Sequence, residues 1–523
     1  MTYCVADIDV LQCSPVSTDS PSARYEGLKL GITTLPAGFQ KSPAHQPFRA
    51  STIYERDIEI PLRDGTVIRA DVFRPEDSRD KVPALVSWSP YGKSGSGLFC
   101  LDIVPGRVGV PQSKLSGFES FEAPDPAEWT ARGFAIVNVN SRGAFESQGD
   151  IRWFGTGEGR DGYDAIEHLA TLPWCSGKIA MVGNSWLAIA QWFIAAERPP
   201  HLACIAPLEG CSDLYREVVC RGGVPFTPFT RFLAQYGIFG KSQQEDILGM
   251  LEKYPIMNEY WEDKRVRFEQ ISIPAYVLAS YSSAIHTEPE YNHVFSDWPI
   301  PGTDYRTFYL AQDYSLLHSV PSNPATLSYQ SNVPSLQMDS DSEELSFEYT
   351  FPTRNYVVGY SRAVLYMSRS EHDDMDVFVQ LRKADSTSNV LQNINIPLKD
   401  LQMKTSEVES VNTNKYIGPT GILRASRRKV DLKLSKPHWP IHSHSQDEKV
   451  PPGEVVKLEI GIWPSGIVFE AGERLVFKVA GHQMTLAEFE PLRGGFKTGN
   501  KGRHVVHLGS EHPSHVFVPF VKI

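Results

Sequence analysis

The feature that most constrains the fold is a change of pattern along the chain. Between about residues 54 and 282, short apolar, β-branched runs alternate with stretches of helical periodicity. Such alternation is typical of a parallel sheet with helices on both faces. From about Tyr305, strand-like runs follow one another with turn signals between them and few helical stretches. This second pattern predicts an all-β sandwich or jelly roll.

Individual elements can be placed in both regions. The turn Arg63-Asp64-Gly65, between Asp57–Pro61 and Val67–Phe73, predicts a hairpin. Buried strands are expected at Ala84–Trp88, Phe134–Asn138 and Lys178–Val182, and helices at Asp161–Leu172 and Leu187–Glu197. In the second region, strands are expected at Leu345–Tyr349, Val377–Leu381, Val456–Ile462, Leu475–Val479, Val505–Leu508 and His515–Val521.

The patterns also divide the chain into domains. Residues 1–50, rich in Ser, Pro, Thr and Gly, are expected to form an extended arm that wraps on the body. Residues 51–300 form the α/β domain, and helical patterns without strands between them predict a cap at about 214–270. The β domain is expected at 301–523.

Composition excludes several classes of function. The chain of 523 residues can bury a large core without disulfides or metals. Its formal net charge of −11 argues against a nucleic-acid partner, because a phosphate-backbone binder needs a basic surface. We see no export signal and no apolar stretch long enough to cross a bilayer, so no membrane partner is expected.

The seven cysteines all lie within the first 220 residues, at irregular spacings and without a CxxC pair. This arrangement supports neither a zinc site nor a disulfide framework. Reduced thiols in a cytoplasmic protein are the expectation.

The segment Lys178–Ala188 carries the most chemical information. A strand runs into Gly183-Asn184-Ser185 and then directly into a helix, which is the context of a nucleophile elbow. The sharp turn would force the Ser185 hydroxyl out at the carboxyl edge of the sheet. The GxSxG pattern is only half matched, because Leu187 stands where the second glycine is usual.

Two other loops are expected at the same edge. Ser89–Lys93 follows a strand, and the Tyr91 phenol could donate a hydrogen bond to an oxyanion there, or could only pack by its ring. A P-loop at Gly92-Lys93 is excluded, because Ser87 occupies the required glycine position. The loop Asn140–Gly149 follows the next strand.

Together these segments resemble the CocE/NonD hydrolases, which are related to the X-prolyl dipeptidyl-peptidases of the S15 peptidase family. The resemblance looks closest to fungal members, some of them associated with secondary-metabolite clusters. It extends in order through Glu209–Arg216, Met257–Lys264, Val450–Val455, Ile462–Ser465, Phe469–Leu475 and Gly502–His504.

The resemblance implies an α/β-hydrolase fold with a helical cap and a C-terminal jelly roll. It implies that Ser185 is the nucleophile, that the Tyr91 phenol and the Trp186 backbone N–H form the oxyanion hole, and that a His oriented by an Asp is the general base. The partner would be a small-molecule acyl substrate, with neither a cofactor nor a metal.

The sequence departs from the family at the acid and the base. Ser283 stands where the family has its Asp, and only 24 positions separate Tyr281 from Tyr305. The family's remaining helices and strand would need roughly 40 residues. His286 is the candidate base, five residues beyond Tyr281.

Alternatives to His286 remain open. His293 and His318 are the other candidate bases, and Glu288 or Asp297 could orient His286. Other polar groups are expected to be structural. These are His438, His442 and His444 in a Pro/Ser-rich loop, and Asp161, Asp164 and Glu167 on a solvated helix face.

Three functions follow from this sequence. The first is a serine hydrolase acting on an ester, lactone or amide of a small molecule, in secondary metabolism if the fungal resemblance holds. The second is an acyltransferase or cyclase that uses the same serine. The third is a non-catalytic binding protein on a degenerate hydrolase scaffold.

Overall fold

The computed structural model describes residues 3–76, 80–104, 110–278, 296–335, 343–394, 404, 415–416, 418–484 and 495–522. The chain forms two compact units. The first, here called the α/β unit, comprises Met1–Val218 and Phe229–Ala279. The second, the β unit, comprises Val219–Pro228 and Ser280–Ile523.

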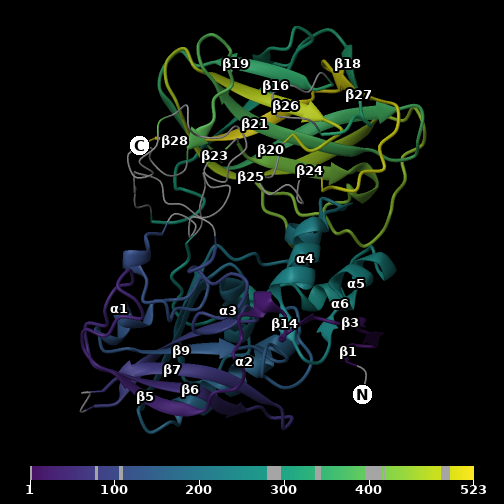
Figure 1. Cartoon of the computed structure of the whole chain (residues 1–523). Helices are drawn as coiled ribbons and strands as arrows, with labels where there is room; N and C mark the ends of the chain where they lie inside the picture. Colours follow the sequence, from purple (N-terminus) through teal and green to yellow (C-terminus); the bar gives the residue numbers. More distant parts are fainter. Residues whose placement is uncertain are drawn as a thin grey trace. The chain divides into compact units, whose positions relative to one another are not determined.

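A seven-stranded sheet in the order β11-β10-β8-β9-β7-β6-β5 forms the centre of the α/β unit (Figure 1). Its strands are β5 (Gly31–Leu35), β6 (Thr52–Pro61), β7 (Val67–Pro75), β8 (Val82–Ser89), β9 (Ala135–Asn140), β10 (Cys175–Asn184) and β11 (Leu202–Leu208). β8 to β11 run parallel, whereas β5, β6 and β7 pair antiparallel. The predicted hairpin and the three predicted buried strands are confirmed, and the sheet is mixed because that hairpin joins it.

The helices that follow the parallel strands pack on this sheet. α2 (Gly155–Ala170) and α3 (Trp186–Ala196) contact each other and β10, and α1 (Pro126–Thr130) contacts β9 and β7. One apolar cluster joins Ala127 of α1 and Phe48 of the arm to Leu85 and Ile136 of the sheet. The carboxyl ends of β8, β9 and β10 therefore meet at one edge, where ligands bind in sheets of this kind.

The N-terminal arm and the insertion after β11 pair through very short strands. β3 (Gln12–Cys13) pairs with β15 (Gln244–Glu245), and β4 (Val16–Ser17) pairs with β14 (Phe239–Gly240). The helices of the insertion are α4 (Pro228–Phe232), α5 (Ile247–Lys253), α6 (Glu259–Asp263) and the π-helical turns Leu214–Val219 and Leu233–Gly237. The expectation of helices without strands was wrong here, because a two-residue strand is too short to leave an alternating pattern.

Residues 219–228, expected in the cap, instead pack within the β unit. β12 (Cys220–Arg221) and β13 (Val224–Pro225) form a hairpin. The Arg424 backbone N–H donates to the carbonyl of Gly222 over 2.7 Å, and the rings of Phe226 and Phe496 lie 4.5 Å apart. These long-range contacts, which no local pattern reveals, assign the segment to the β unit.

The β unit is a sandwich of two antiparallel sheets (Figure 1). One sheet contains β16 (Asp304–Leu310), β17 (Leu316–Leu317), β18 (Ala325–Gln330), β20 (Asn355–Arg369), β25 (Val456–Phe469), β27 (Arg503–Leu508) and β28 (His515–Val521). The other contains β19 (Leu345–Thr350), β21 (Asp376–Ala384), β24 (Thr420–Arg424) and β26 (Arg474–Ala480). Fully buried apolar residues from the two sheets form one core.

All six strands predicted in the β unit are confirmed. The longest strand, β20, was missed, because Gly359, Ser361 and Arg362 interrupt its apolar pattern. Minor elements complete the described structure: β1 (Cys4–Val5), β2 (Ile8–Asp9), β22 (Asn393–Ile394), β23 (Lys415–Tyr416) and single turns at Pro21–Ala23, Gln112–Lys114, Phe268–Gln270 and Ala425–Arg427.

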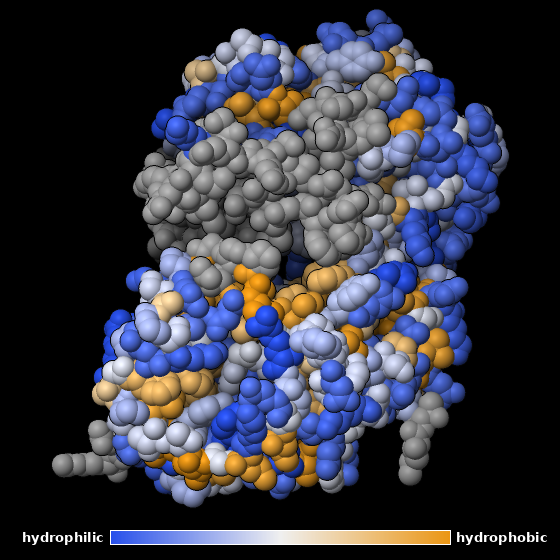
Figure 2. Space-filling view, in the orientation of Figure 1, coloured by the Kyte–Doolittle hydropathy of each residue, from blue (hydrophilic) through white to orange (hydrophobic). Residues whose placement is uncertain are grey.

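The surface in view is mostly hydrophilic, with apolar side chains scattered over it (Figure 2). Among the described residues, Ile32 on the edge strand β5 is one of the most exposed large apolar side chains, at 70%. Scattered apolar side chains of this kind are normal for a folded protein. Among the described residues, no helix is both long and apolar enough to cross a membrane.

Candidate active site

Ser185 lies at the turn between β10, which ends at Asn184, and α3, which begins at Trp186. Its backbone has φ 55° and ψ −117°, a strained conformation that costs about 1–3 kcal/mol. Two hydrogen bonds hold it: the Ser185 N–H donates to the carbonyl of Leu208 over 3.0 Å, and the Ile189 N–H donates to the Ser185 carbonyl over 2.9 Å. The predicted strand–turn–helix geometry is therefore present.

Small residues allow α3 to approach the sheet closely at this turn. Gly183 has φ +148°, and a Cβ atom there would lie 2.6 Å from the Cβ of Leu187. A Cβ atom on Gly210 would lie 2.8 Å from the Cβ of Ala188. Leu187 replaces the usual second glycine of the motif without a clash, because its space is the one that Gly183 leaves empty.

The structure brings Tyr91 next to this turn. Tyr91 follows β8 and is buried, and its ring lies 5.8 Å from the Trp186 ring in an edge-on arrangement. Phe99 and Phe121 pack on the same tyrosine ring, at 5.1 and 6.0 Å. The Tyr91 ring therefore packs tightly, and this packing holds its phenol on the loop beside the elbow.

The environment keeps the Tyr91 phenol protonated. Burial raises its pKa well above the ordinary value of 10, and the nearby carboxyls of Glu122 and Glu158 raise it further. Trp186 is the first residue of α3, so its backbone N–H has no acceptor within the helix. A neutral phenol and an amide at a helix N-terminus are donors suited to a developing oxyanion.

The loop after β9 braces this edge of the sheet. The Ser141 N–H donates to the Ser89 carbonyl over 3.0 Å. The Arg142 guanidinium binds Asp161 of α2 over 2.6 Å and Asp64 of the β6–β7 turn over 2.8 Å. The charge of Arg142 is therefore used in a structural ion-pair network.

The prediction of a solvated acidic face on α2 was wrong for Asp161. Asp161 is 4% exposed and pairs with Arg142. Asp164 accepts two hydrogen bonds from the Arg63 guanidinium, and Glu167 lies 2.7 Å from the Nδ1 atom of His201. Periodicity placed these carboxylates on a helix face but could not show the basic groups that cover it.

Two carboxyls near the elbow were not predicted from the sequence. Glu122 contacts Asn184 twice: its carbonyl accepts the Asn184 N–H over 3.1 Å, and its carboxyl accepts the Asn184 side-chain amide over 3.2 Å. Burial raises the pKa of Glu122 to about 8, although the Asn184 hydrogen bond lowers it. The other is Glu158, a glutamate among glycines at the start of α2, and that composition was the only available signal.

The candidate general base cannot be placed. His286, His293, Ser283 and Glu288 lie outside the described residues. Asp297 is exposed in the β unit, where it accepts the Trp298 N–H over 2.7 Å. His318 is also exposed in the β unit, and its Nε2 atom lies 3.2 Å from the Tyr349 hydroxyl.

A Ser–His–Asp arrangement occurs elsewhere in the α/β unit. The Ser42 hydroxyl lies 2.8 Å from Nδ1 of His45, and Nε2 of His45 lies 2.8 Å from the carboxylate of Asp102. Ser42 is also part of a tight turn, where its hydroxyl accepts the Ala44 N–H over 3.4 Å. Because the hydroxyl of Ser42 already has a structural role in this turn, we interpret the cluster as a structural contact between the arm and the loop that contains Asp102.

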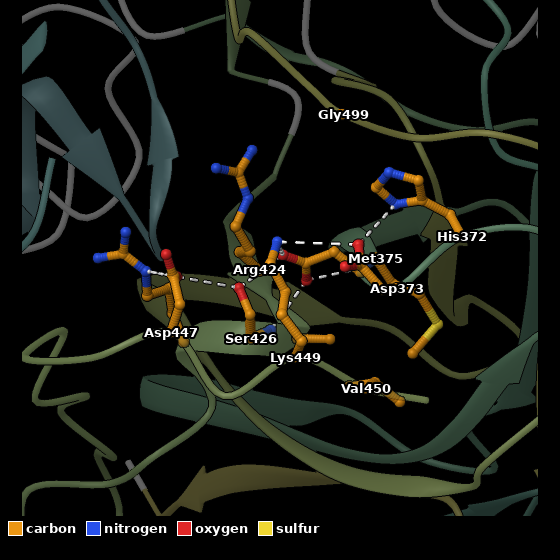
Figure 3. Close-up of polar contacts among 12 residues, drawn as sticks. His372, Asp373, Met375, Arg424, Ser426, Asp447, Lys449, Val450 and Gly499 are labelled. Atoms are coloured by element: carbon orange, nitrogen blue, oxygen red, sulfur yellow. Dashed lines mark hydrogen bonds and ion pairs between the residues drawn. The ribbon is translucent and has the colours of Figure 1, made fainter. Parts of the chain in front are cut away.

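The β unit contains its own polar network of buried and half-exposed side chains (Figure 3). The Asp374 carboxylate accepts the backbone N–H of Ser426 over 2.9 Å, its hydroxyl over 2.6 Å and the Lys449 ammonium over 3.0 Å. Arg427 pairs with Asp447 beside them. Asp374 therefore connects the segments that contain Ser426 and Lys449.

The histidines of the Pro/Ser-rich loop show no metal-binding geometry. The rings of His442 and His444 lie 5.9 Å apart, and His438 packs against Tyr305 and Tyr360. Across the described ranges, no group of three or more His, Cys, Asp or Glu side chains is placed to hold a metal ion.

Comparison with protein families identifies two domains, one after the other in the sequence. Residues 64–246 match the X-Pro dipeptidyl-peptidase (S15 family) domain. Residues 274–517 match the X-Pro dipeptidyl-peptidase C-terminal non-catalytic domain. Ser185 and Tyr91 fall in the first match, and the two matches together cover most of the chain.

Solved structures confirm the predicted fold. A CocE/NonD family hydrolase from Staphylococcus aureus is 24% identical, with a TM-score of 0.78 over 94% of this chain and 97% of that one. An α-amino acid ester hydrolase is 13% identical, with a TM-score of 0.63 over 90% of this chain and 97% of that one. An α/β-hydrolase unit followed by an all-β unit is thus the architecture of this chain.

Curated relatives match the chain over shorter stretches. A putative serine esterase of Mycobacterium bovis is 25% identical over 228 residues, which is 42% of this chain. The cocaine esterase of a Rhodococcus species is 29% identical over 160 residues, which is 31% of this chain. The matched stretches span only 35% and 24% of the lengths of these two relatives.

Proposed function

Because the chain belongs to the S15 family of X-Pro dipeptidyl-peptidase-like proteins, we propose that it is a serine hydrolase. Its substrate would be a small molecule with an ester, lactone or amide acyl group. The observation that carries the proposal is the strained strand-to-helix turn that presents Ser185, with Tyr91 packed beside it.

The proposed reaction follows the chemistry of the site. The Ser185 hydroxyl attacks the acyl carbonyl while its proton passes to a general base. The carbonyl oxygen becomes an oxyanion, which accepts hydrogen bonds from the Tyr91 phenol and the Trp186 N–H. The alcohol or amine then leaves with a proton, and water releases the acyl group from Ser185. The raised pKa of Tyr91 suits this role, because only a protonated phenol can donate.

Covalent labelling tests the nucleophile. A fluorophosphonate probe should label the wild-type protein and the Ser42→Ala variant, but not Ser185→Ala. Ser42→Ala is the matched control, because Ser42 already touches a histidine that touches an aspartate. Folded wild-type protein that takes up no probe, or takes it up at Ser42, would refute the proposal.

Hydrolysis is separated from acyl transfer by product analysis. With p-nitrophenyl acetate as the probe substrate, Ser185→Ala should lower kcat/KM by at least about 10³-fold. Products are then compared with and without an added alcohol or amine. Free acid as the main product supports the hydrolase, whereas transfer to the added acceptor would favour an acyltransferase.

His286 remains the proposed general base. His286→Gln should lower kcat by about 10²–10⁴-fold, since a positioned base contributes this much. His293→Gln and His318→Gln are the matched controls and should retain wild-type rates. Loss of activity in either control, with His286→Gln active, would reassign the base.

The location and the metabolic role are further proposals. We propose a cytoplasmic protein, because all seven cysteines are free thiols, as suits a reducing compartment. Cell fractionation tests this location. The resemblance to fungal hydrolases motivates a secondary-metabolite substrate, which comparison of metabolites with and without the gene would test.

A further inference from the structure

Glu158 is a buried carboxyl in the first turn of α2. It is 2% exposed, and three N–H donors converge on it. Its Oε1 atom accepts the indole N–H of Trp88 over 2.8 Å and that of Trp186 over 3.4 Å. Its Oε2 atom accepts the backbone N–H of Phe154 over 2.7 Å. One side chain thus gathers donors from β8, from α3 and from the residue before α2.

The two indoles belong to the segments that carry the proposed oxyanion donors. Trp88 is the second-last residue of β8 and lies three positions before Tyr91. Trp186 follows Ser185 directly and begins α3. Both indoles are at most 2% exposed, so neither can move without disturbing its surroundings. Through these hydrogen bonds, Glu158 connects the strand that precedes Tyr91 to the helix that follows Ser185.

The Trp186 ring also contacts the rings around it, including that of Tyr91. It lies 4.2 Å from the Phe154 ring, 4.9 Å from the Trp153 ring and 5.8 Å from the Tyr91 ring. A shift of the indole would therefore move the Tyr91 ring and the first turn of α3 together. Misplacement of catalytic groups by about 1 Å can cost 10²-fold in rate.

Only a group that accepts hydrogen bonds can fill this position. Two indole N–H groups and a backbone N–H are donors without any acceptor capacity. A carboxylate offers enough lone pairs for all three, whereas a glutamine amide would present two donors of its own. The negative end also suits the N-terminus of α2, where the helix dipole favours an anion.

Burial opposes the negative charge that this role needs, whereas the hydrogen bonds that Glu158 accepts favour it. Burial raises the pKa of Glu158 to about 7, although the hydrogen bonds from Trp88, Phe154 and Trp186 lower it. The Lys264 ammonium lowers it slightly from a distance and is itself paired with Glu245 over 2.8 Å. The charge on Glu158 in turn helps to raise the pKa of Tyr91.

We propose that Glu158 is a positioning residue of the oxyanion hole, which holds Trp88 and Trp186 so that the Tyr91 phenol and the Trp186 N–H meet the same oxygen. The inference rests on the proposed serine hydrolase function. It adds that the hydrogen bonds of one buried carboxyl set the geometry of transition-state binding, with no contact between that carboxyl and the substrate.

The test compares Glu158→Gln with Asp161→Asn. Asp161 is the matched control, because it is a buried carboxyl one turn further along α2 that binds Arg142 and neither indole. For Glu158→Gln, kcat with p-nitrophenyl acetate should fall about 10- to 100-fold, with KM within about threefold. The affinity for phenylboronic acid, which forms a tetrahedral anion on the serine, should fall by a similar factor.

A double variant tests whether Glu158 acts through the indole. Trp88→Phe removes one of the three N–H donors and keeps an aromatic ring. If Glu158 works through Trp88, then Glu158→Gln should lower kcat less in the Trp88→Phe background than in the wild type. Equal effects in the two backgrounds would place the link through Trp186, to be checked in Trp186→Phe, and equal effects there too would overturn the proposal.

Two outcomes separate this inference from the proposed function. Wild-type protein that fluorophosphonate does not label would refute the hydrolase itself. Wild-type protein that is labelled, with Glu158→Gln matching it in kcat and boronate affinity, would overturn only the positioning role. A fall in kcat of the same size in Asp161→Asn would also overturn it, because general destabilisation would then explain the loss.

Discussion

Glu158 in the α/β unit and Asp374 in the β unit are both buried carboxyls, yet their surroundings shift their pKa values in opposite directions. Glu158 accepts only neutral N–H donors, and burial raises its pKa to about 7. Asp374 accepts the Ser426 hydroxyl and N–H and the Lys449 ammonium, and these bonds hold its pKa below the usual range despite burial.

The difference teaches how the two units use charge. In the β unit, the Lys449 ammonium and the Ser426 donors compensate the charge of the Asp374 carboxylate, which is sufficient for a structural role. In the α/β unit Glu158 accepts from neutral N–H donors, and Glu122, which accepts from the Asn184 side-chain amide, also has a raised pKa, of about 8. Groups with raised pKa values in such settings gather at functional sites.

The largest expected effect separates two buried tyrosines, one in each unit. Tyr91→Phe should lower kcat/KM by about 10²–10³-fold, because the variant lacks one oxyanion donor. Tyr329→Phe is the matched control in the β unit, where the hydroxyl lies 3.1 Å from Nδ1 of His504. Steady-state kinetics with p-nitrophenyl acetate measure both. Wild-type kinetics for Tyr91→Phe would remove Tyr91 from the oxyanion hole.

The next effect is on the pH dependence of stability, to which Glu158 and Asp374 should contribute with opposite signs. The raised pKa of Glu158 means that the folded state keeps a proton that the unfolded state loses above about pH 4.5. Stability should therefore fall as pH rises toward 7, by at most about 3 kcal/mol. Glu158→Gln should flatten this slope in urea unfolding at pH 5, 6 and 7.

Asp374 should show the reverse. Its lowered pKa contributes stability that is fully present above the unfolded value near 3.8 and is lost as pH falls through the folded value. Asp374→Asn should remove this acid sensitivity below about pH 4 and leave the slope between pH 5 and 7 unchanged. A parallel slope in Asp374→Asn and Glu158→Gln would break the comparison.

A smaller effect is expected when the Asp374 network in the β unit is disrupted. Asp374→Ala leaves the buried Ser426 N–H without its acceptor, while the Ser426 hydroxyl keeps only Asp447 at 3.3 Å, and should destabilise the protein by about 1–3 kcal/mol. Lys449 is half exposed and should add little. The urea midpoint should shift, while the rate of fluorophosphonate labelling of folded protein stays at the wild-type value. A slower labelling rate would mean that the network serves the serine.

The smallest effect is expected on the outer side of α2. Asp164→Asn removes the pair with Arg63, whose side chain is 52% exposed, and should cost about 0.2–1 kcal/mol. The urea midpoint measures this change, and added salt should reduce it. A loss of stability as large as that of Asp374→Ala would show that solvent exposure does not determine how much these carboxylates contribute to stability.

Much of the fold could be predicted from local sequence patterns. The strand before Ser185, the helix after it and the six predicted strands of the β unit are each encoded by periodicity within about ten residues. The pairing of Tyr91 with the elbow could also be predicted, because parallel strands bring their carboxyl ends to one edge. The structure shows Tyr91 and Trp186 in ring contact, as this reasoning requires.

Other features could not be predicted, because they depend on distant partners. Asp161 was expected on a solvated face and is buried against Arg142, which lies 19 positions away in another loop. The segment 219–228 was expected in the cap and packs with β24. The candidate base His286 stays a prediction, because it lies outside the described residues.

The order of the elements and the placement of Ser185 at a strand-to-helix turn therefore follow from short-range patterns of apolar and small residues in the sequence. Which charges are buried, and with what partners, depends on the folded arrangement. Glu158 accepts from Trp88, 70 positions away, and from Trp186, 28 positions away. The pKa of a carboxyl depends on its burial and on donors that folding brings from elsewhere in the chain, so the order of residues alone does not contain it.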